Sequence, residues 1–221
     1  MIRKNLRNAL IVITLILVSY VNAEASILLG EVTGGRAFTK GGTFVVLDPP
    51  ISVVDRNNLQ SFNLWGFDED QAVLLNSPLE VNQGYGIGDF VPTGTLVSSH
   101  YVIFDPKGYT RMIGYVEFDN DILGVMTKRK TLLASDFLGH DSVFYINSSL
   151  RGLEGGNRVW VEENNPRRLY INTTASSPGD WVRVITGAVE PTDSAVPEPT
   201  SLLLFGLGAS ALGIARRKFK K

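Results

Sequence analysis

WVRVIT, residues 181–186, alternates between two sets of side chains with a period of two. In an extended chain Trp181, Arg183 and Ile185 face one side, and the three residues between them face the other. The four residues before this run, Ser-Pro-Gly-Asp at 177–180, are typical of a turn. The segment therefore predicts a β-strand that begins directly after a turn.

The middle of the chain repeats this pattern of β-branched and aromatic runs separated by turns. Further strands are expected at residues 27–33, 43–47, 61–67, 96–104, 111–118, 142–146, 158–161 and 168–173. Turn signals separate them at residues 105–108, 119–121, 155–157 and 164–166. One segment, residues 128–138, predicts a short helix that ends at Gly139. The spacing predicts an all-β fold, with a single β-sandwich or jelly-roll-like domain over residues 26–188.

Composition excludes several kinds of chemistry. The chain has 221 residues, enough for one domain and additional segments, and it contains no cysteine and two histidines. Disulfide frameworks, cysteine-ligated zinc, iron–sulfur clusters and thiol catalysis are therefore excluded. A metal centre built from several histidines is nearly excluded as well.

Charge is distributed unevenly along the chain. Residues 26–195 hold 13 basic and 20 acidic residues, a net charge of −7, whereas the whole chain has −1. Nucleic-acid binding depends on neutralisation of phosphates by lysine and arginine, so we expect no nucleic-acid partner. Cations such as calcium, or neutral polymers such as sugars, fit an acidic domain better.

The N-terminus has the pattern of an export signal. Residues 1–8 carry three basic residues, and an apolar run follows at residues 9–18. Small residues then offer cleavage sites for signal peptidase after Ala23 or Ala25. This order of basic, apolar and small residues predicts a secretory signal peptide over residues 1–25. An uncleaved N-terminal anchor is the alternative, although the apolar run is short for a membrane span.

The C-terminus has three parts in succession. Residues 189–201 form a linker rich in Pro, Ser and Thr, which ends in a motif made of Val196, Pro197, Glu198 and Pro199. An apolar stretch of 14 residues follows at 202–215, and a helix of that length spans about 21 Å against a hydrocarbon core of about 30 Å. The basic residues Arg216, Arg217 and Lys218 then act as a membrane stop on the cytoplasmic side. Residues 202–221 are thus expected to be a short hydrophobic sorting helix with a basic tail.

This tail resembles the PEP-CTERM sorting domain of Gram-negative bacteria. The resemblance implies that a membrane-embedded peptidase of the exosortase type cuts near the motif, in association with exopolysaccharide export. Pro197, Glu198 and Pro199 would then be recognition residues for that peptidase. The precursor is expected to be anchored transiently in the inner membrane, and the mature protein to reach the cell surface or the extracellular space. A plain C-terminal tail anchor is the alternative.

No pattern in the middle of the chain indicates catalysis. His100 follows Ser98 and Ser99, and His140 precedes Asp141, yet no Gly-x-Ser-x-Gly motif accompanies them. We interpret His100 as a half-buried structural histidine in a strand. A glycosidase needs two carboxylates at a set separation across the sugar, and the sequence does not show which of the 20 acids in residues 26–195 would form such a pair.

Two other features allow binding functions. Asp68 and Asp70, and likewise Asp119 and Asp121, are weak candidates for a structural calcium site, with solvated turns as the simpler interpretation. The three tryptophans and several tyrosines form either a carbohydrate-binding platform or part of the core; the tryptophans are Trp65, Trp160 and Trp181. The leading hypothesis is a non-enzymatic exported protein of the cell surface or matrix that needs no cofactor. A lectin-like module that binds exopolysaccharide is the alternative, and a glycoside hydrolase is a third.

Overall fold

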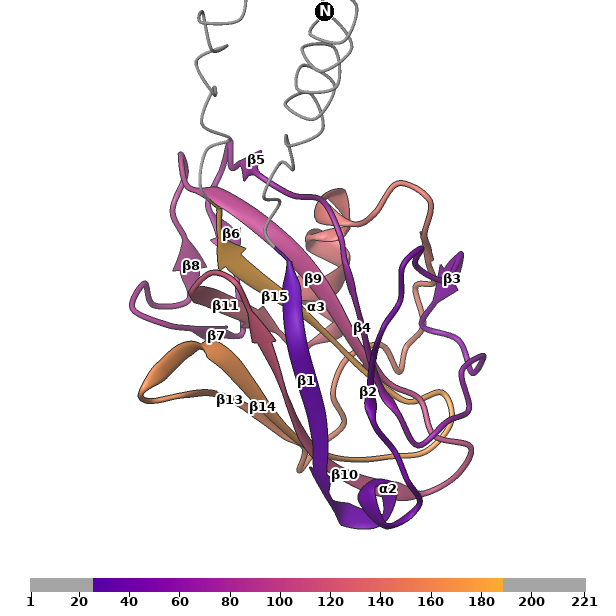
Figure 1. Cartoon of the computed structure of the whole chain (residues 1–221). Helices are drawn as coiled ribbons and strands as arrows, with labels where there is room; N and C mark the ends of the chain where they lie inside the picture. Colours follow the sequence, from indigo (N-terminus) through magenta and orange to yellow (C-terminus); the bar gives the residue numbers. More distant parts are fainter. Residues whose placement is uncertain (1–25, 189–221) are drawn as a thin grey trace, which may run out of the picture. The chain divides into compact units, whose positions relative to one another are not determined.

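The computed structural model describes residues 26–188, in which most strands belong to two large sheets packed face to face (Figure 1). The four-stranded sheet is antiparallel throughout. Its strands, in spatial order, are β1 (Ile27–Gly34), β10 (Thr110–Phe118), β14 (Asn165–Ala175) and β13 (Arg158–Glu162). β1 and β13 are therefore the edge strands of this sheet.

The seven-stranded sheet has β9 and β15 at its centre. Its path is β2 (Phe44–Val46), β4 (Leu64–Asp68), β9 (Leu96–Phe104), β15 (Asp180–Gly187), β11 (Ile122–Met126) and β7 (Gln83–Gly84), and β5 (Val73–Leu74) also pairs with β9. All neighbours are antiparallel except β2 and β4, which are parallel.

Smaller elements complete the described chain. Two short pairs are formed by β3 (Val53–Val54) with β12 (Phe144–Tyr145), and by β6 (Leu79–Glu80) with β8 (Phe90–Val91). The helical elements are α2 (Gly35–Thr39), α3 (Arg129–Ala134) and the 3₁₀ turn η1 (Asp136–Leu138).

The alternation of β15 distributes its side chains between two cores. Val182 and Val184 enter the first core, which fills the space between the two sheets together with residues such as Met112. Trp181 and Ile185 enter the second core, on the other face of the larger sheet. Because a strand turns successive side chains to opposite faces, this one segment contributes to both cores.

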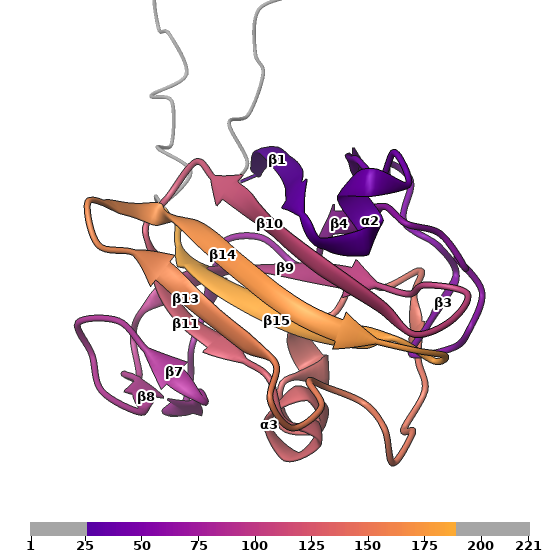
Figure 2. The same cartoon turned by 90° about the horizontal axis from the view of Figure 1, so that it is seen from below.

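The second core is covered by short helices and loops. Leu132 of α3, Leu138 of η1 and Val143 of the following loop pack against Tyr101 of β9. Figure 2, seen from below, shows the four-stranded sheet in front of the larger sheet, with α3 at the side. The domain is therefore a two-sheet sandwich with a third layer of helices and loops.

Both ends of the domain are held by the turn between β10 and β11. The backbone amide of Asp119 donates to the carbonyl of Ser26 over 3.1 Å, and the amide of Gly187 donates to the carbonyl of Asp121 over 3.0 Å. The first and last described residues therefore lie at the same end of the sandwich.

The expected all-β fold is confirmed, and the helix expected at residues 128–138 is present as two pieces, α3 and η1, the second of which ends before Gly139. The structure also contains elements that were not expected: β11, α2 and the short strands β3, β5, β6, β7 and β8. The strand expected at 61–67 begins at Leu64. The turn expected at 164–166 lies at residues 163–164 instead. The jelly-roll connectivity stays a prediction. Among residues 26–188 there is no helix with the length and apolar character that a membrane span requires.

Candidate functional site

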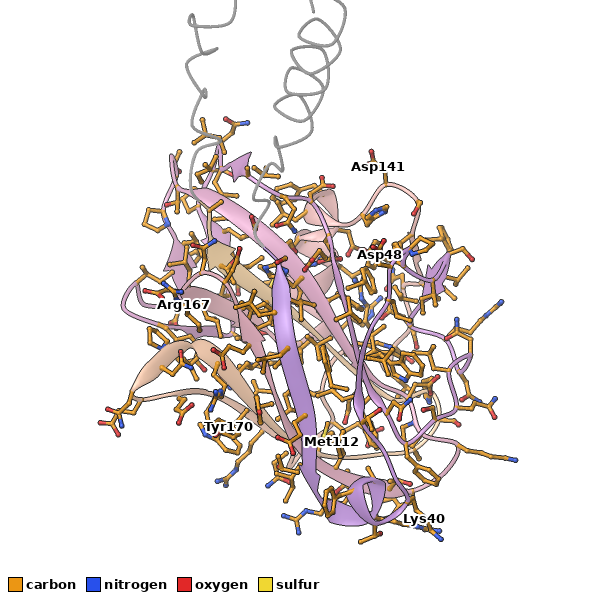
Figure 3. The ribbon with its side chains drawn as sticks, in the orientation of Figure 1. Lys40, Asp48, Met112, Asp141, Arg167 and Tyr170 are labelled. Carbon is orange, nitrogen blue, oxygen red and sulfur yellow. The ribbon has the colours of Figure 1, made fainter. Side chains whose placement is uncertain are left out.

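An aromatic row crosses the outer face of the four-stranded sheet. The register places Tyr115 of β10 opposite Tyr170 of β14, and Tyr170 opposite Trp160 of β13. Neighbouring residues of these strands, such as Val116 and Leu169, point inward and are buried. The three aromatic residues therefore project to the solvent side, where Figure 3 shows Tyr170. We call these three residues the aromatic row.

The rings of the aromatic row contact one another. The ring centroids of Trp160 and Tyr170 are 5.4 Å apart and their planes differ by 10°, a stacked arrangement. The centroids of Tyr170 and Tyr115 are 5.7 Å apart with a tilt of 55°. Trp160 is 42% exposed although it is a tryptophan, a residue type that is normally well buried.

An ion-paired group borders the row on one side. The guanidinium of Arg168 lies 4.6 Å from the ring centroid of Tyr115, in a cation–π contact. The same guanidinium lies 2.6 Å from a carboxylate oxygen of Glu117 and 3.2 Å from one of Glu162. The Tyr115 hydroxyl donates to the Glu31 carboxylate over 3.1 Å. These contacts hold Tyr115 in place at one end of the row.

The chemistry of this face suits recognition of a polar ligand with an apolar side. Aromatic faces carry partial negative charge and attract the weakly positive C–H groups on one face of a sugar ring. Carboxylates and guanidinium groups beside the rings supply hydrogen-bond acceptors and donors. The sequence had indicated Trp160 and unspecified tyrosines, but it had not identified Tyr115 and Tyr170 as its neighbours.

A second cluster of functional groups is buried on the opposite face of the larger sheet. We call it the buried ion network; it consists of Asp55, Glu69, Asp136, Arg151 and Arg183. Four of these side chains are completely buried, and that of Asp136 is 29% exposed. Sequence reasoning did not predict that these residues pair, because the partners are far apart in the chain.

Arg183 is the centre of this network. Its guanidinium donates to both carboxylate oxygens of Glu69, over 2.6 and 2.7 Å. It also donates to the Ser135 hydroxyl over 2.6 Å and to the Leu132 carbonyl over 3.0 Å. Tyr145 donates a further hydrogen bond to Glu69, over 2.5 Å. Paired, bidentate contacts of this kind compensate for the removal of charges from water.

Arg151 forms the other half of the network. It donates to both oxygens of Asp136, over 2.8 and 2.7 Å, and its Nε lies 2.8 Å from Asp55 Oδ2. Burial raises the pKa of Asp55 to about 6, and the positive charge of Arg151 opposes that rise. Burial also raises the pKa of Tyr101, whose hydroxyl donates to Asp55 over 2.7 Å. The network thus joins loop residues to the central strands through paired charges.

Neither Ser98 nor Ser99 pairs with His100; the hydroxyl that contacts its ring belongs to Thr186, which is completely buried. His100 is completely buried, so the expectation of a half-buried histidine was wrong: both faces of the larger sheet are covered. Its Nδ1 lies 2.6 Å from Asp68 Oδ1, and its Nε2 lies 3.1 Å from Thr186 Oγ1. Ser99 instead donates to Glu69 over 2.6 Å, on the other face of β9. His140 accepts a hydrogen bond from the backbone amide of Ser142.

The acidic candidates for calcium lie in separate surroundings. Asp68 accepts hydrogen bonds from the Ile27 amide and contacts His100, while Asp121 pairs with Arg167 over 3.2 Å. Asp119 accepts a hydrogen bond from the neighbouring Asn120. Burial, followed by the negative charge of Asp141, raises the pKa of Asp70. Within residues 26–188 no three His, Asp or Glu side chains are grouped as a metal site requires.

The three tryptophans occupy different places. Trp181 is 1% exposed in the second core, Trp65 packs partly buried against the same core, and Trp160 is exposed in the aromatic row. The interpretation as core residues therefore holds for Trp181 and Trp65 but not for Trp160.

The residues predicted to direct export and sorting lie outside the described residues. They are the cleavage residues Ala23 and Ala25, the motif Val196, Pro197, Glu198 and Pro199, and the stop residues Arg216, Arg217 and Lys218. Their roles stay predictions from the sequence.

The fold and its two clusters define an all-β domain with an exposed aromatic row and a buried ion network. Residues 195–221 match the family model of the PEP-CTERM protein-sorting motif. The resemblance of the tail is thereby confirmed, and the motif supports an exported, exosortase-sorted protein with a membrane-anchored precursor. No curated protein and no solved structure matches the chain.

Proposed function

We propose that this chain is a non-enzymatic protein of the cell surface or extracellular matrix, exported through its signal peptide and processed at its C-terminal sorting signal. The observation that carries this proposal is the sorting motif at residues 195–221. Its partners would be signal peptidase and an exosortase-type peptidase.

The buried ion network is not the source of an enzymatic activity in this proposal. A general acid or base must reach the proton that it transfers on a bound substrate. Glu69 and Asp55 have completely buried side chains, and each is held by an arginine. A glycosidase would need two carboxylates on either side of a bound sugar. The buried ion network does not provide this arrangement.

Processing is tested with a Glu198→Ala variant in the producing organism. Glu198 lies in the matched segment, so its loss should leave the full-length precursor in the membrane fraction. The matched control is Glu190→Ala, which changes another Glu-Pro pair eight residues upstream and outside the matched segment. Immunoblotting of cell fractions and intact mass spectrometry of the mature protein measure the outcome. A wild-type protein that keeps residues 202–221 after maturation would contradict processing.

The aromatic row favours a second candidate function, a lectin-like module that binds the exopolysaccharide. An exposed tryptophan stacked on a second ring is fixed in orientation before a ligand arrives, which lowers the entropy cost of binding. Saturable retention of the exported protein on purified exopolysaccharide would support this function. The same retention by a Trp160→Ala variant would exclude the aromatic row as the binding site.

A further inference from the structure

The aromatic row divides the outer face into two sides of different charge. On one side lie Glu117, Arg168 and Glu162, which neutralise one another in ion pairs. On the other side lie Arg111 and Arg158, and neither forms an ion pair within residues 26–188. The second side is therefore locally basic on a domain that is acidic as a whole.

Asn172 lies next to both arginines. It is the cross-strand partner of Arg158, and it follows Tyr170 by two residues, on the same face of β14. Arg111 donates from its Nε to the Asn172 side-chain oxygen over 3.3 Å. The pair of arginines and the amide form a group of hydrogen-bond donors beside the row.

Trp160 offers a surface for stacking beside this group. One face of its indole is covered by Tyr170, and β13 has a strand neighbour on that side alone. The exposed area of Trp160 is therefore on the open edge of the sheet. Arg158 precedes Trp160 by two residues on the same face of β13 and is also exposed. A ligand that touches the indole is thus within reach of the Arg158 guanidinium.

We propose that this face binds a carboxylated sugar, a uronic acid residue of an extracellular polysaccharide, with its ring against Trp160 and its carboxylate at Arg158 and Arg111. The inference rests on the carbohydrate-binding role proposed above and names the class of sugar. Guanidinium groups suit a planar carboxylate, to which they donate two parallel hydrogen bonds.

The overall negative charge of the domain does not prevent this contact. Between residues 26 and 195 the net charge is −7, which repels a polyanion at a distance. Mobile ions screen that repulsion over about 8 Å at physiological salt, whereas hydrogen-bonded pairs act at contact. The local charge of this face, not the net charge of the domain, therefore decides which polysaccharide binds. The ligand inferred here is acidic, whereas the net charge alone favoured a neutral polymer.

The test measures binding of the processed exported protein to exopolysaccharide purified from the producing organism. The polysaccharide is used in two forms, native and with its uronate carboxylates chemically reduced to alcohols. Arg158→Gln and Arg111→Gln should each weaken binding of the native form by roughly tenfold, the value of one charged hydrogen bond. They should leave binding of the reduced form unchanged. Trp160→Ala should weaken binding of both forms by about tenfold or more, because it removes the stacking surface.

Matched controls lie outside this face. Arg56→Gln removes an exposed arginine, and Phe144→Ala removes an aromatic side chain of β12 that is 68% exposed; neither should change binding. Circular dichroism checks that each variant is folded. Trp160→Phe keeps an aromatic surface and should keep most of the binding, which separates stacking from damage to the sheet.

Each result has a distinct meaning. Equal binding of the two forms, unaffected by Arg158→Gln, would overturn the inference about acidic sugars and leave the carbohydrate role intact. An absence of binding to both forms would overturn the carbohydrate role itself. Processing at Glu198 is measured separately and would be untouched by either result.

Discussion

Arg183 is completely buried and donates to Glu69, Ser135 and the Leu132 carbonyl. A charge in this position depends on its partners, because removal of one partner leaves the other charged and without water. Asp180 is a different case, since it is buried and accepts hydrogen bonds from Thr173 and Asn157. These two residues allow energetic predictions at the scale of one side chain.

Arg183→Met should destabilise the domain by about 3–5 kcal/mol, the cost of breaking one partner from a buried ion pair. The double variant Arg183→Met with Glu69→Gln should be less destabilised than the two single effects together, because no buried charge is left unpaired. The control is Arg167→Met, which breaks an ion pair with Asp121 whose side chains are 52% and 60% exposed. That change should cost less than about 1 kcal/mol. Urea unfolding measures the four variants Arg183→Met, Glu69→Gln, their double variant and Arg167→Met, and equal costs for Arg183→Met and Arg167→Met would contradict the prediction.

Because of Asp180, we predict that the stability of the folded domain depends on pH. Burial raises the pKa of Asp180 to about 6, and its hydrogen bonds from Thr173, Glu154 and Asn157 reduce that rise. The folded state therefore binds this proton more tightly than the unfolded chain, whose aspartates have a pKa near 3.9. The stabilisation that comes from protonated Asp180 is therefore fully present below about pH 4 and is lost as pH rises through 6.

Asp180→Asn should therefore reduce the gain in the free energy of unfolding that the wild type shows between pH 7 and pH 5. Part of the gain should persist, because the pKa of Asp55 is also raised to about 6. Urea unfolding at a series of pH values measures this gain. A wild type whose stability is constant between pH 7 and pH 5 would refute the prediction.

At the scale of elements, the contact of β1 and β4 with β2 depends on glycines that leave room for the Phe44 ring. A Cβ built on Gly30 would lie 2.5 Å from Phe44 Cγ, and one on Gly66 would lie 3.1 Å from Phe44 Cζ. Phe44 itself packs against the first core. Glycine is therefore needed at these two positions for close packing. Their backbone angles do not require glycine, because neither has a positive φ.

Gly30→Ala should destabilise the domain by about 1–3 kcal/mol, because the ring base of Phe44 must move out of a packed position. Gly108→Ala is the matched control: a Cβ there meets nothing within 4 Å and its φ is not positive. Its stability should be unchanged or slightly higher, since alanine restricts the unfolded chain. Thermal unfolding compares the two variants, and a neutral Gly30→Ala would show that Phe44 does not require this space.

At the scale of the whole molecule, β9 and β15 are the strands most enclosed by others. Each has strand neighbours on both sides, and each contributes buried side chains to both cores. β13 has one neighbour and carries the exposed Trp160. The stability of the sandwich is therefore expected to be highest at its centre and lowest at its margins.

Hydrogen exchange measured by mass spectrometry should show this order. Backbone amides of β9 and β15 should exchange slowest, and those of β6, β8 and β13 considerably faster, because the short and edge strands open without unfolding of the cores. Equal protection of β13 and β15 would contradict this arrangement.

Calcium should have little effect on the folded domain. Asp68 and Asp121 are already engaged by His100 and Arg167, and the described acids do not gather into a group that suits the ion. We expect the same Tm in calcium and in chelator, measured by calorimetry. A higher Tm in calcium would restore the structural calcium hypothesis.

The sequence by itself determined the class of fold, the positions of the main strands and the sorting tail. Strands such as β9 and β15 follow from a period of two, which is a local property of the chain. The sorting motif at 195–221 is likewise a linear signal that a peptidase reads along the chain. β11 was not predicted from the sequence, because its five residues, Ile122–Met126, directly follow the Asp119–Asp121 turn and include Gly124.

The tertiary structure alone decided which residues share a face and which are paired. Between β13 and β14 the register shifts between Val161 and Glu162, so that Trp160 meets Tyr170. A simple hairpin around the turn at 163–164 would have placed Arg167 there, and the aromatic row would not exist. The buried ion network likewise joins Arg183 to Glu69 across 114 positions in the chain. Local patterns specify elements, whereas register and long-range pairing depend on the packing of the whole domain, and both the aromatic row and the buried ion network arise at that level.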